Sequence, residues 1–327
     1  MDDSLLEFEM AETATGIVRD CLEVRPDEEV FVIADPRTFG VARSITTAAR
    51  SVGADVVTAV MPLLESHGNE PLDTIAEGMA AADVAFTCTT HAITHTHARL
   101  RAAEAGTRIG ILRSVTEEMM VEGAMAVDFV ELRRRTEAVR DVLDAGSEVQ
   151  VTCPNGTDVS FSIEGCDAFS LDGYFHEEYG FATLPPGESP THPKEGTANG
   201  RIVIDVSMDD IGQLDEPITL DVVDGFVDRV SGGEEAAQLR TIFDGADGNA
   251  RNLAEFAVGT NPNAKLMGNL AEDKKLEGTV HFAVGDNESL GGTTPSTIHL
   301  DGVIRTPTVV VDGTTLVDDG RLVHEAL

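Results

Sequence analysis

The sequence predicts an α/β fold in two parts, a Rossmann-like N-terminal domain with a parallel sheet and a strand-rich α+β C-terminal domain. Up to residue 113, apolar runs of strand length alternate with segments of helix length, which is typical of a parallel sheet covered by helices. From residue 148 onward, short apolar runs are separated by tight-turn dipeptides such as Asn-Gly and Asp-Gly. We therefore expect domains at residues 1–147 and 148–327, which suits a chain of 327 residues.

The first domain is expected to contain four strands with helices between them. The turn after the first strand, ADPRTFG, has neither a G-x-G-x-x-G nor a G-x-x-x-x-G-K-[ST] motif, so no phosphate-binding loop is predicted. Residues 116–145 are expected to form helices that lead into the second domain. The strands are predicted at 29–35, 54–61, 83–89 and 107–113, and the helices at 39–53, 71–82 and 96–106.

The charge of the chain excludes several classes of partner. The formal net charge is −35, from 58 acidic and 23 basic residues, and this field opposes binding to nucleic acid or to an anionic membrane surface. The acidic residues are spread through the chain and lysines are few, which indicates a halophilic protein of a salt-rich cytoplasm. No apolar run approaches 18 residues and the N-terminus is acidic, so we expect a cytoplasmic protein with no membrane partner.

The stretch TIHLDGVI places two polar side chains inside an apolar run. On a strand, His299 and Asp301 point to one face, while Ile298 and Leu300 point to the other. Such a pair forms one edge of a metal site, but a histidine beside a carboxylate is also an ordinary way to satisfy a buried imidazole. The pair alone leaves both interpretations open.

Three further residues of the second domain lie in apolar or rigid surroundings. Glu255 is the only charge between Leu253 and Val258, where we expect a helix, and a structural salt bridge there is as reasonable as a metal ligand. His281 lies in the middle of an apolar strand, and Glu188 lies in a loop framed by proline and glycine. With His299 and Asp301 they make two glutamates, two histidines and one aspartate, which suits two divalent metal ions with a bridging carboxylate.

Other groups of reactive residues in the sequence give weaker evidence of a functional site than this set does. There is no G-x-S-x-G motif, and the four cysteines are far apart without a C-x-x-C pair. The histidines of THAITHTHARL, His91, His95 and His97, have no carboxylate among them. We expect that cluster to begin a helix or to contact another domain rather than to bind metal.

Several stretches of the chain resemble a known family. They are ITHTHARLRAAEAGTRIGILRSVTEEMM, VTCPNGTDVSFSIEG, LPPGES, ARNLAEFAVGTNPNA and EGTVHFAVGDNESLGGTTPSTIHLDGVI. Together they resemble the thermophilic or leucyl aminopeptidases of the aminopeptidase T type, dinuclear metallo-exopeptidases to which the 2,5-dihydroxypyridine ring-opening dioxygenases are related. The resemblance runs over most of the chain. It implies a metal-dependent aminopeptidase, a hydrolase that acts on short peptides through a metal-activated water, and it implies a homodimer.

The resemblance also implies roles for individual residues. It makes Glu188, Glu255, His281, His299 and Asp301 the ligands of two Zn, Co or Mn ions, with Glu255 as the bridge. Two positions depart from the aminopeptidase pattern. Glu288 stands where a catalytic tyrosine is expected, and Lys274 lies near the place of a further acidic residue. The alternative is a mononuclear non-haem Fe(II) ring-cleaving dioxygenase, in which His299, Asp301 and either His281 or Glu255 hold the iron.

Overall fold

The computed structural model describes residues 3–94, 96–177 and 179–323, which divide into two compact units. Unit 1 comprises Met1–Arg133 and Leu171–Pro186, and unit 2 comprises Arg134–Ser170 and Gly187–Leu327. The chain passes between the units three times. The division into domains at residues 1–147 and 148–327 concerns parts that fold independently, and it stays a prediction. The mixed α/β class is confirmed, because unit 1 holds a parallel sheet and unit 2 is rich in antiparallel strands.

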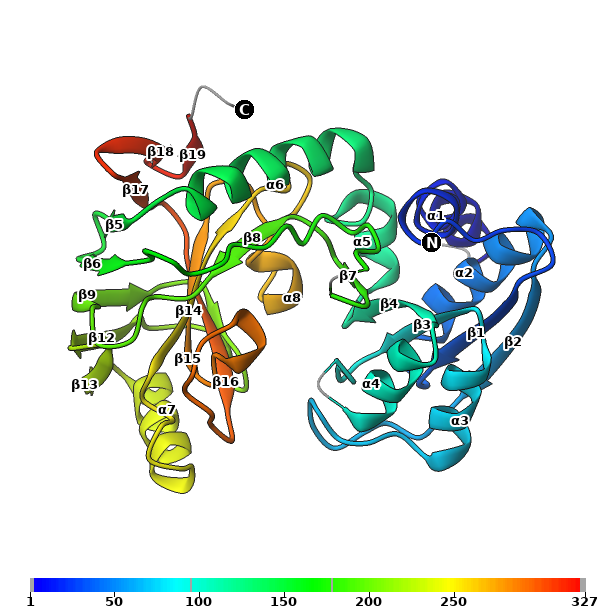
Figure 1. The fold of residues 1–327 in the computed structure, drawn as a ribbon, viewed down its shortest axis with the longest axis horizontal. Helices are drawn as coiled ribbons and strands as arrows, with labels where there is room; N and C mark the ends of the chain where they lie inside the picture. The colour runs from blue at the N-terminus through cyan, green and yellow to red at the C-terminus, as the bar shows by residue number, and fades with distance from the viewer. Residues whose placement is uncertain (1–2, 95, 178, 324–327) are drawn as a thin grey trace. The chain divides into compact units, whose positions relative to one another are not determined.

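Unit 1 is built on a five-stranded parallel sheet in the order β2-β1-β3-β4-β7 (Figure 1). Side chains of alternate strand residues enter two apolar clusters, one shared with α1 and α2 and the other with α3 and α4. The elements are α1 Asp3–Gly16, η1 Ile17–Cys21, β1 Glu29–Ala34, α2 Phe39–Val52, β2 Asp55–Val60, α3 Asp73–Ala81, β3 Val84–Thr89, α4 His97–Glu104, β4 Arg108–Arg113, α5 Glu117–Glu122 and β7 Ala182–Leu184.

The predicted order of strands and helices in this unit is confirmed. Helix α2 ends at Gly53, whose φ of 102° lies in the left-handed region that favours glycine. Helix α4 begins at His97, after Thr96 caps it by accepting a hydrogen bond from the Arg99 backbone. His95 lies outside the described residues. None of the helices in the described ranges is both long and apolar enough to span a bilayer.

Unit 2 contains an eight-stranded sheet, β13-β12-β9-β6-β5-β17-β18-β19, and a six-stranded sheet, β11-β10-β16-β15-β14-β8. Helix α6, Phe129–Asp144, carries the chain into it. The remaining elements are β5 Glu148–Thr152, β6 Asp158–Ser162, β8 Glu188–Thr191, β9 Asn199–Ile204, β10 Ser207–Met208, β11 Gly212–Gln213, β12 Ile218–Val223, β13 Phe226–Ser231, α7 Glu234–Gly245, β14 Leu253–Gly259, α8 Leu270–Asp273, β15 Val280–Gly285, η2 Glu288–Leu290, β16 His299–Ile304, β17 Thr308–Val311, β18 Thr314–Asp318 and β19 Arg321–Leu322.

Both sheets of unit 2 contribute to one apolar core. Phe161 of β6, Phe256 of β14 and Phe282 of β15 meet there, with ring centroids 5.2 to 5.9 Å apart. Leu300 of β16 joins the same core, as the alternation in TIHLDGVI predicts. Because successive strand residues point to opposite faces, the second face of the six-stranded sheet is left for the polar residues of these strands.

Glu255 lies on a strand, so the expected helix at this position is wrong. Strand β14 carries a β-bulge: Leu253 pairs with Val284 and Glu255 pairs with Ala283, which leaves Ala254 as the extra residue. The bulge shifts the alternation by one residue, so Leu253 enters the apolar core while the Glu255 side chain points to the polar face. The bulge thus directs the Glu255 carboxylate away from the core.

Candidate metal centre

Adjacent strands of the six-stranded sheet bring the five predicted ligands together on one face. Glu255 comes from β14, His281 from β15, and His299 and Asp301 from β16, while Glu188 begins β8 on the other side of β14. The cross-strand register places Ala283 opposite both Glu255 and Asp301, so these two carboxylates flank β15. Their role as metal ligands stays a prediction from sequence.

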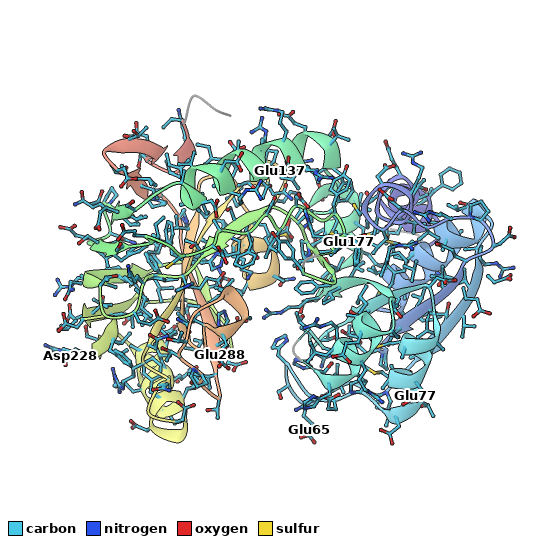
Figure 2. All side chains as sticks on the ribbon, viewed as in Figure 1. Glu65, Glu77, Glu137, Glu177, Asp228 and Glu288 are labelled. Atoms are coloured by element: carbon cyan, nitrogen blue, oxygen red, sulfur yellow. The ribbon has the colours of Figure 1, made fainter. Side chains whose placement is uncertain are left out.

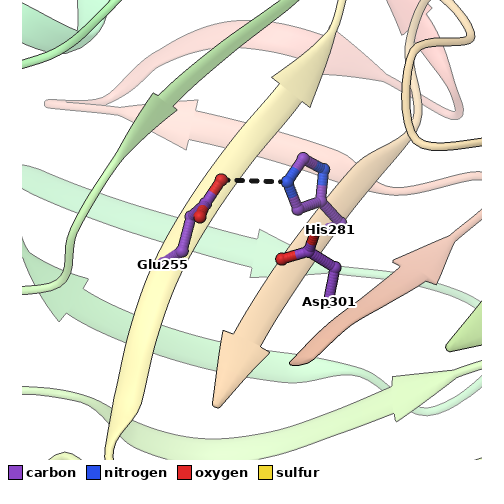
Figure 3. A group of neighbouring side chains, drawn as sticks. All are labelled: Glu255, His281 and Asp301. Atoms are coloured by element: carbon purple, nitrogen blue, oxygen red, sulfur yellow. Dashed lines mark hydrogen bonds and ion pairs between the residues drawn. The ribbon is translucent and has the colours of Figure 1, made fainter. Parts of the chain in front are cut away.

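Three of these residues form a buried group with the composition of a metal site. Glu255, His281 and Asp301 each offer one ligand atom, and these atoms all lie within 4.8 Å of one another (Figure 3). The Nε2 atom of His281 is 3.1 Å from Oε1 of Glu255. His281 is fully buried, and Glu255 and Asp301 are 6% and 2% exposed. Two carboxylates and an imidazole in such proximity suit a divalent transition metal.

His299 provides the test of whether a cation fits here. Its Nδ1 lies 2.7 Å from the backbone carbonyl of Asp286, which can only accept, so Nδ1 carries the proton of that bond. In the neutral ring, Nε2 then presents a lone pair to Oε2 of Glu255 at 3.0 Å and Oδ1 of Asp301 at 3.2 Å. These three acceptor atoms repel one another unless a proton or a metal ion lies among them, so the residues present fit a bound cation.

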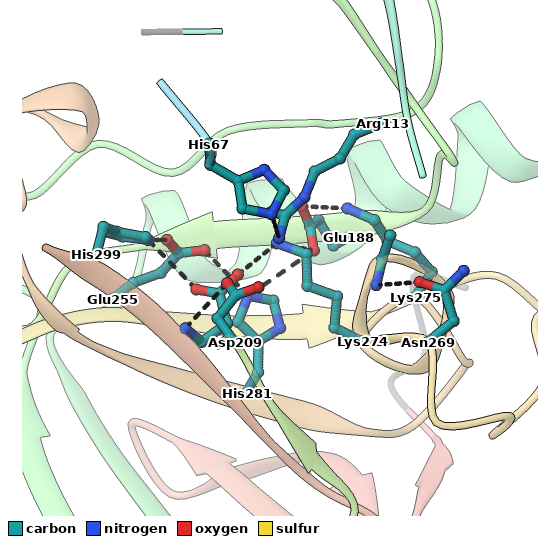
Figure 4. Close-up of polar contacts among 12 residues, drawn as sticks. His67, Arg113, Glu188, Asp209, Glu255, Asn269, Lys274, Lys275, His281 and His299 are labelled. Atoms are coloured by element: carbon teal, nitrogen blue, oxygen red, sulfur yellow. Dashed lines mark hydrogen bonds and ion pairs between the residues drawn. The ribbon is translucent and has the colours of Figure 1, made fainter. Parts of the chain in front are cut away.

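Two lysines that follow α8 border the same group (Figure 4). The Nζ atom of Lys274 is 2.8 Å from Oδ2 of Asp301 and 3.5 Å from Oε2 of Glu188. Lys275 forms an ion pair with Oε1 of Glu188, and its side chain is almost completely buried. A β-carbon on Gly259 would lie 2.2 Å from the Leu276 carbonyl, so glycine permits this lysine-bearing segment to approach the end of β14.

The charged neighbours set the pKa values of the group. Burial alone would raise the pKa of Glu188, but Lys274 and Lys275 outweigh it and hold that pKa below its usual value. Burial and Asp301 would raise the pKa of Glu255, but the adjacent His281 and His299 outweigh them and lower it. The pKa of Asp301 is also well below its usual range, because Lys274 and the histidines outweigh burial. Burial lowers the pKa of Lys275 to about 8.

Three further acidic residues of unit 2 lie outside the group of five. Glu288 lies exposed on η2 (Figure 2), and its backbone amide donates to Asp286. Within the described part of the chain, its carboxylate forms no hydrogen bond or ion pair with the five clustered residues. Asp273 accepts hydrogen bonds from Ser207 and from the Met267 and Gly268 amides, and Glu272 accepts one from the Lys265 amide. These two carboxylates therefore anchor the local backbone.

Sequence reasoning did not identify the residues that support the cluster. The Asp286 carbonyl fixes the ring of His299, and the Asp209 amide donates to the Asp301 carbonyl at 2.9 Å. Neither contact has a signal in local sequence, because each joins segments far apart or uses a backbone atom. The pair Lys274–Lys275 is the one visible signal, since it contains two of only four lysines in a strongly acidic chain.

Comparison with known proteins identifies two kinds of relative. The family model described as 2,5-dihydroxypyridine 5,6-dioxygenase matches residues 10–324. A 2,5-dihydroxypyridine 5,6-dioxygenase of Pseudomonas putida KT2440 is 26% identical over 317 residues, covering 89% of this chain and 88% of that protein. The solved structure of the 2,5-dihydroxypyridine dioxygenase from Pseudomonas putida KT2440 has a TM-score of 0.83 at 21% identity and covers 100% of this chain and 99% of that one.

The second kind of relative shows the fold alone. Wild-type AmpT of Thermus thermophilus, an aminopeptidase T, has a TM-score of 0.70 at 18% identity, covering 97% of this chain and 99% of that one. The expected aminopeptidase T-like fold is thus supported, but the expected hydrolase activity is wrong. The matching family and the relative in Pseudomonas putida are dioxygenases, which are oxidoreductases. The candidate ligands could not distinguish the two activities, because carboxylates and imidazoles bind metals in both hydrolases and oxidoreductases.

Proposed function

Because the chain belongs to the 2,5-dihydroxypyridine 5,6-dioxygenase family, we propose that it opens a dihydroxylated pyridine ring with dioxygen at a single non-haem Fe(II) ion. Both atoms of the dioxygen molecule enter the ring-opened product. The match over residues 10–324 supports the reaction class, and one observation in this chain supports the site. That observation is the buried group of Glu255, His281 and Asp301, with the Nε2 atom of His299 facing two of its carboxylate oxygens.

The donor set suits iron of this kind. Two imidazoles and one carboxylate that leave coordination positions open are typical of non-haem Fe(II) oxygenases, and His281, His299 and Asp301 supply those groups. When bound, Fe(II) supplies the redox chemistry that dioxygen needs in order to react with a closed-shell ring. Glu255 contacts both histidines and holds them side by side. The side chain of His299 is 31% exposed, whereas those of His281 and Asp301 are at most 3% exposed, so His299 is the member of this set that is most accessible to solvent.

The proposal is tested by oxygen consumption. Protein stripped of metal and loaded anaerobically with Fe(II) is mixed with 2,5-dihydroxypyridine in aerated buffer. We expect one molecule of dioxygen consumed for each ring opened, followed with an oxygen electrode and by the loss of ring absorbance. Asp301→Asn is expected to lose this activity, because it removes a charged ligand. Asp318→Asn, an equal change at an exposed position of β18, is the control and is expected to retain it.

Iron-loaded protein that consumes no oxygen with this substrate would contradict the proposed reaction. Pairing as a homodimer and location in the cytoplasm stay predictions from sequence. Gel filtration with light scattering checks the first, and cell fractionation checks the second.

A further inference from the structure

The five clustered residues do not by themselves determine how many metal ions bind. Glu188, Glu255, His281, His299 and Asp301 offer three carboxylates and two imidazoles, which is enough for a pair of divalent ions that share a carboxylate. Two-metal sites hold their ions about 3.5–4 Å apart, so both ions would have to fit among these side chains. The contacts of the two lysines bear directly on this question.

Lys274 divides the oxygens of Asp301 between two kinds of partner. Oδ1 faces His299, at 3.2 Å from Nε2, while Oδ2 faces the Lys274 ammonium at 2.8 Å. If Asp301 were to bind one metal ion through each oxygen, both oxygens would have to be free of other cations. In this arrangement the second oxygen of Asp301 is taken by a side-chain cation. The same ammonium lies 3.5 Å from Oε2 of Glu188, so it occupies the space between these two carboxylates.

Lys275 engages the remaining oxygen of Glu188. Its ammonium pairs with Oε1, and the residue is 1% exposed. Glu188 is therefore compensated by two ammonium groups, although its Oε2 also lies 3.8 Å from Nε2 of His281. With the buried Asp209, whose Oδ2 lies 3.4 Å from the Asp301 amide, four carboxylates face two ammonium groups, and one divalent ion offsets the two excess negative charges. A second ion would add unbalanced positive charge beside Lys274.

We propose that the ammonium of Lys274 occupies the position of a second cation between Asp301 and Glu188, and thereby restricts the cluster to one metal ion. This inference rests on the proposed function only in that the cluster holds a metal. Lys274 is a positioning residue, which acts by holding Oδ2 of Asp301 and leaving Oδ1 for the metal beside His299. Metal number, rather than turnover, is the direct consequence.

The test counts Mn²⁺ ions bound to the full chain. Metal-free wild type, Lys274→Glu and Lys274→Gln are titrated with Mn²⁺ by calorimetry, and the spin coupling of bound ions is read by electron paramagnetic resonance. We expect wild type to bind one ion and to give an uncoupled signal. Lys274→Glu is expected to bind two ions with a coupled signal, because it replaces the ammonium with a further carboxylate. Lys274→Gln should bind a second ion at least ten-fold more tightly than any weak second binding that wild type shows at high Mn²⁺ concentration.

Lys194→Gln is the matched control, since its exposed ammonium pairs with Glu164 outside the cluster. It should bind one ion, as wild type does. Wild type that binds two coupled ions overturns the inference without any variant. So does a second Mn²⁺ affinity that is unchanged in Lys274→Gln, or a folded Lys274→Glu that still binds one ion, with folding checked by circular dichroism. Wild type with one ion and no oxygen uptake would instead overturn the proposed reaction and leave the inference standing.

Discussion

Unit 1 and unit 2 both bury carboxylates, but they compensate them differently. In unit 1, Asp35 is 1% exposed at the end of β1, and its two oxygens accept hydrogen bonds from the Arg37 and Thr90 amides at 2.8 and 2.6 Å. In unit 2, Asp301 is equally buried, and its oxygens face Lys274 and His299 instead. Backbone amides satisfy a carboxylate permanently, whereas an arrangement of ionisable side chains can exchange a proton for a metal. The difference separates a structural carboxylate from one that is proposed to bind metal.

The faces of the two sheets follow the same contrast. The parallel sheet of unit 1 has apolar clusters on both faces, so the side chains of its strands mainly pack against the covering helices. The six-stranded sheet of unit 2 packs one face into an aromatic core and bears carboxylates and imidazoles on the other. A rigid apolar face therefore backs the strands that hold the candidate ligands.

The largest expected effects come from the two cores. Phe86 of unit 1 and Phe256 of unit 2 are both fully buried, and truncation of either to alanine should cost about 3–5 kcal/mol in the free energy of unfolding. If each unit has its own core, hydrogen exchange should accelerate mainly within the unit that carries the change. Urea denaturation with mass-spectrometric exchange measures both. Equal acceleration in both units after either change would break the comparison.

Paired aspartate variants test the two kinds of carboxylate. Asp301→Ala should weaken metal binding at least 100-fold, or about 2.7 kcal/mol, because it removes a proposed ligand. Asp35→Ala should leave metal affinity unchanged and reduce the free energy of unfolding by about 1–3 kcal/mol, because two partly buried backbone amides lose their acceptor. Calorimetric titration with Mn²⁺ and urea denaturation give the two numbers. Loss of metal affinity in Asp35→Ala would remove the distinction.

A smaller effect on stability is expected from substitution of Glu195, which anchors the loop that precedes β16. Burial would raise the pKa of Glu195, but hydrogen bonds from Thr293 and Asn287 outweigh it and lower that pKa from 4.5 to about 2. A lowered pKa means that the stabilisation is complete above the unfolded value of 4.5 and is lost as the pH falls toward 2. Glu195→Gln should therefore be less stable than wild type near neutral pH, and the difference should shrink in acid. A difference in melting temperature that is constant with pH would be inconsistent with this role.

The smallest effect on stability per residue is expected from exposed acidic side chains, which both units carry. Exposed acidic side chains such as Glu77 in unit 1 and Asp228 in unit 2 contribute to the net charge of −35 (Figure 2). Raising KCl shortens the screening length from about 10 Å at 0.1 M to about 3 Å at 1 M, which weakens their repulsion. We expect the melting temperature to rise by a few degrees over this range. A melting temperature that falls with KCl would argue against the predicted halophilic character.

The sequence predicted the parts of the fold that local patterns determine. Strands and helices of unit 1 alternate with clear periods, so their order was correct. The strand of Glu255 was mistaken for a helix, because a short apolar run fits either element and the β-bulge that reorients it depends on its partner strand. The contacts of Lys274 and Lys275 arise only when the segment after α8 folds against the sheet. The reaction class was missed for a chemical reason, since the same ligand types serve hydrolases and oxygenases.

The polar face of the six-stranded sheet is proposed to hold one metal ion among His281, His299 and Asp301, beside Glu255. Anomalous diffraction at the iron edge, from crystals grown and loaded with Fe(II) under anaerobic conditions, tests it most directly. We expect one strong peak per chain, within bonding distance of nitrogens of His281 and His299 and of an Asp301 oxygen. Two peaks in the cluster, or a peak elsewhere with none there, would contradict it.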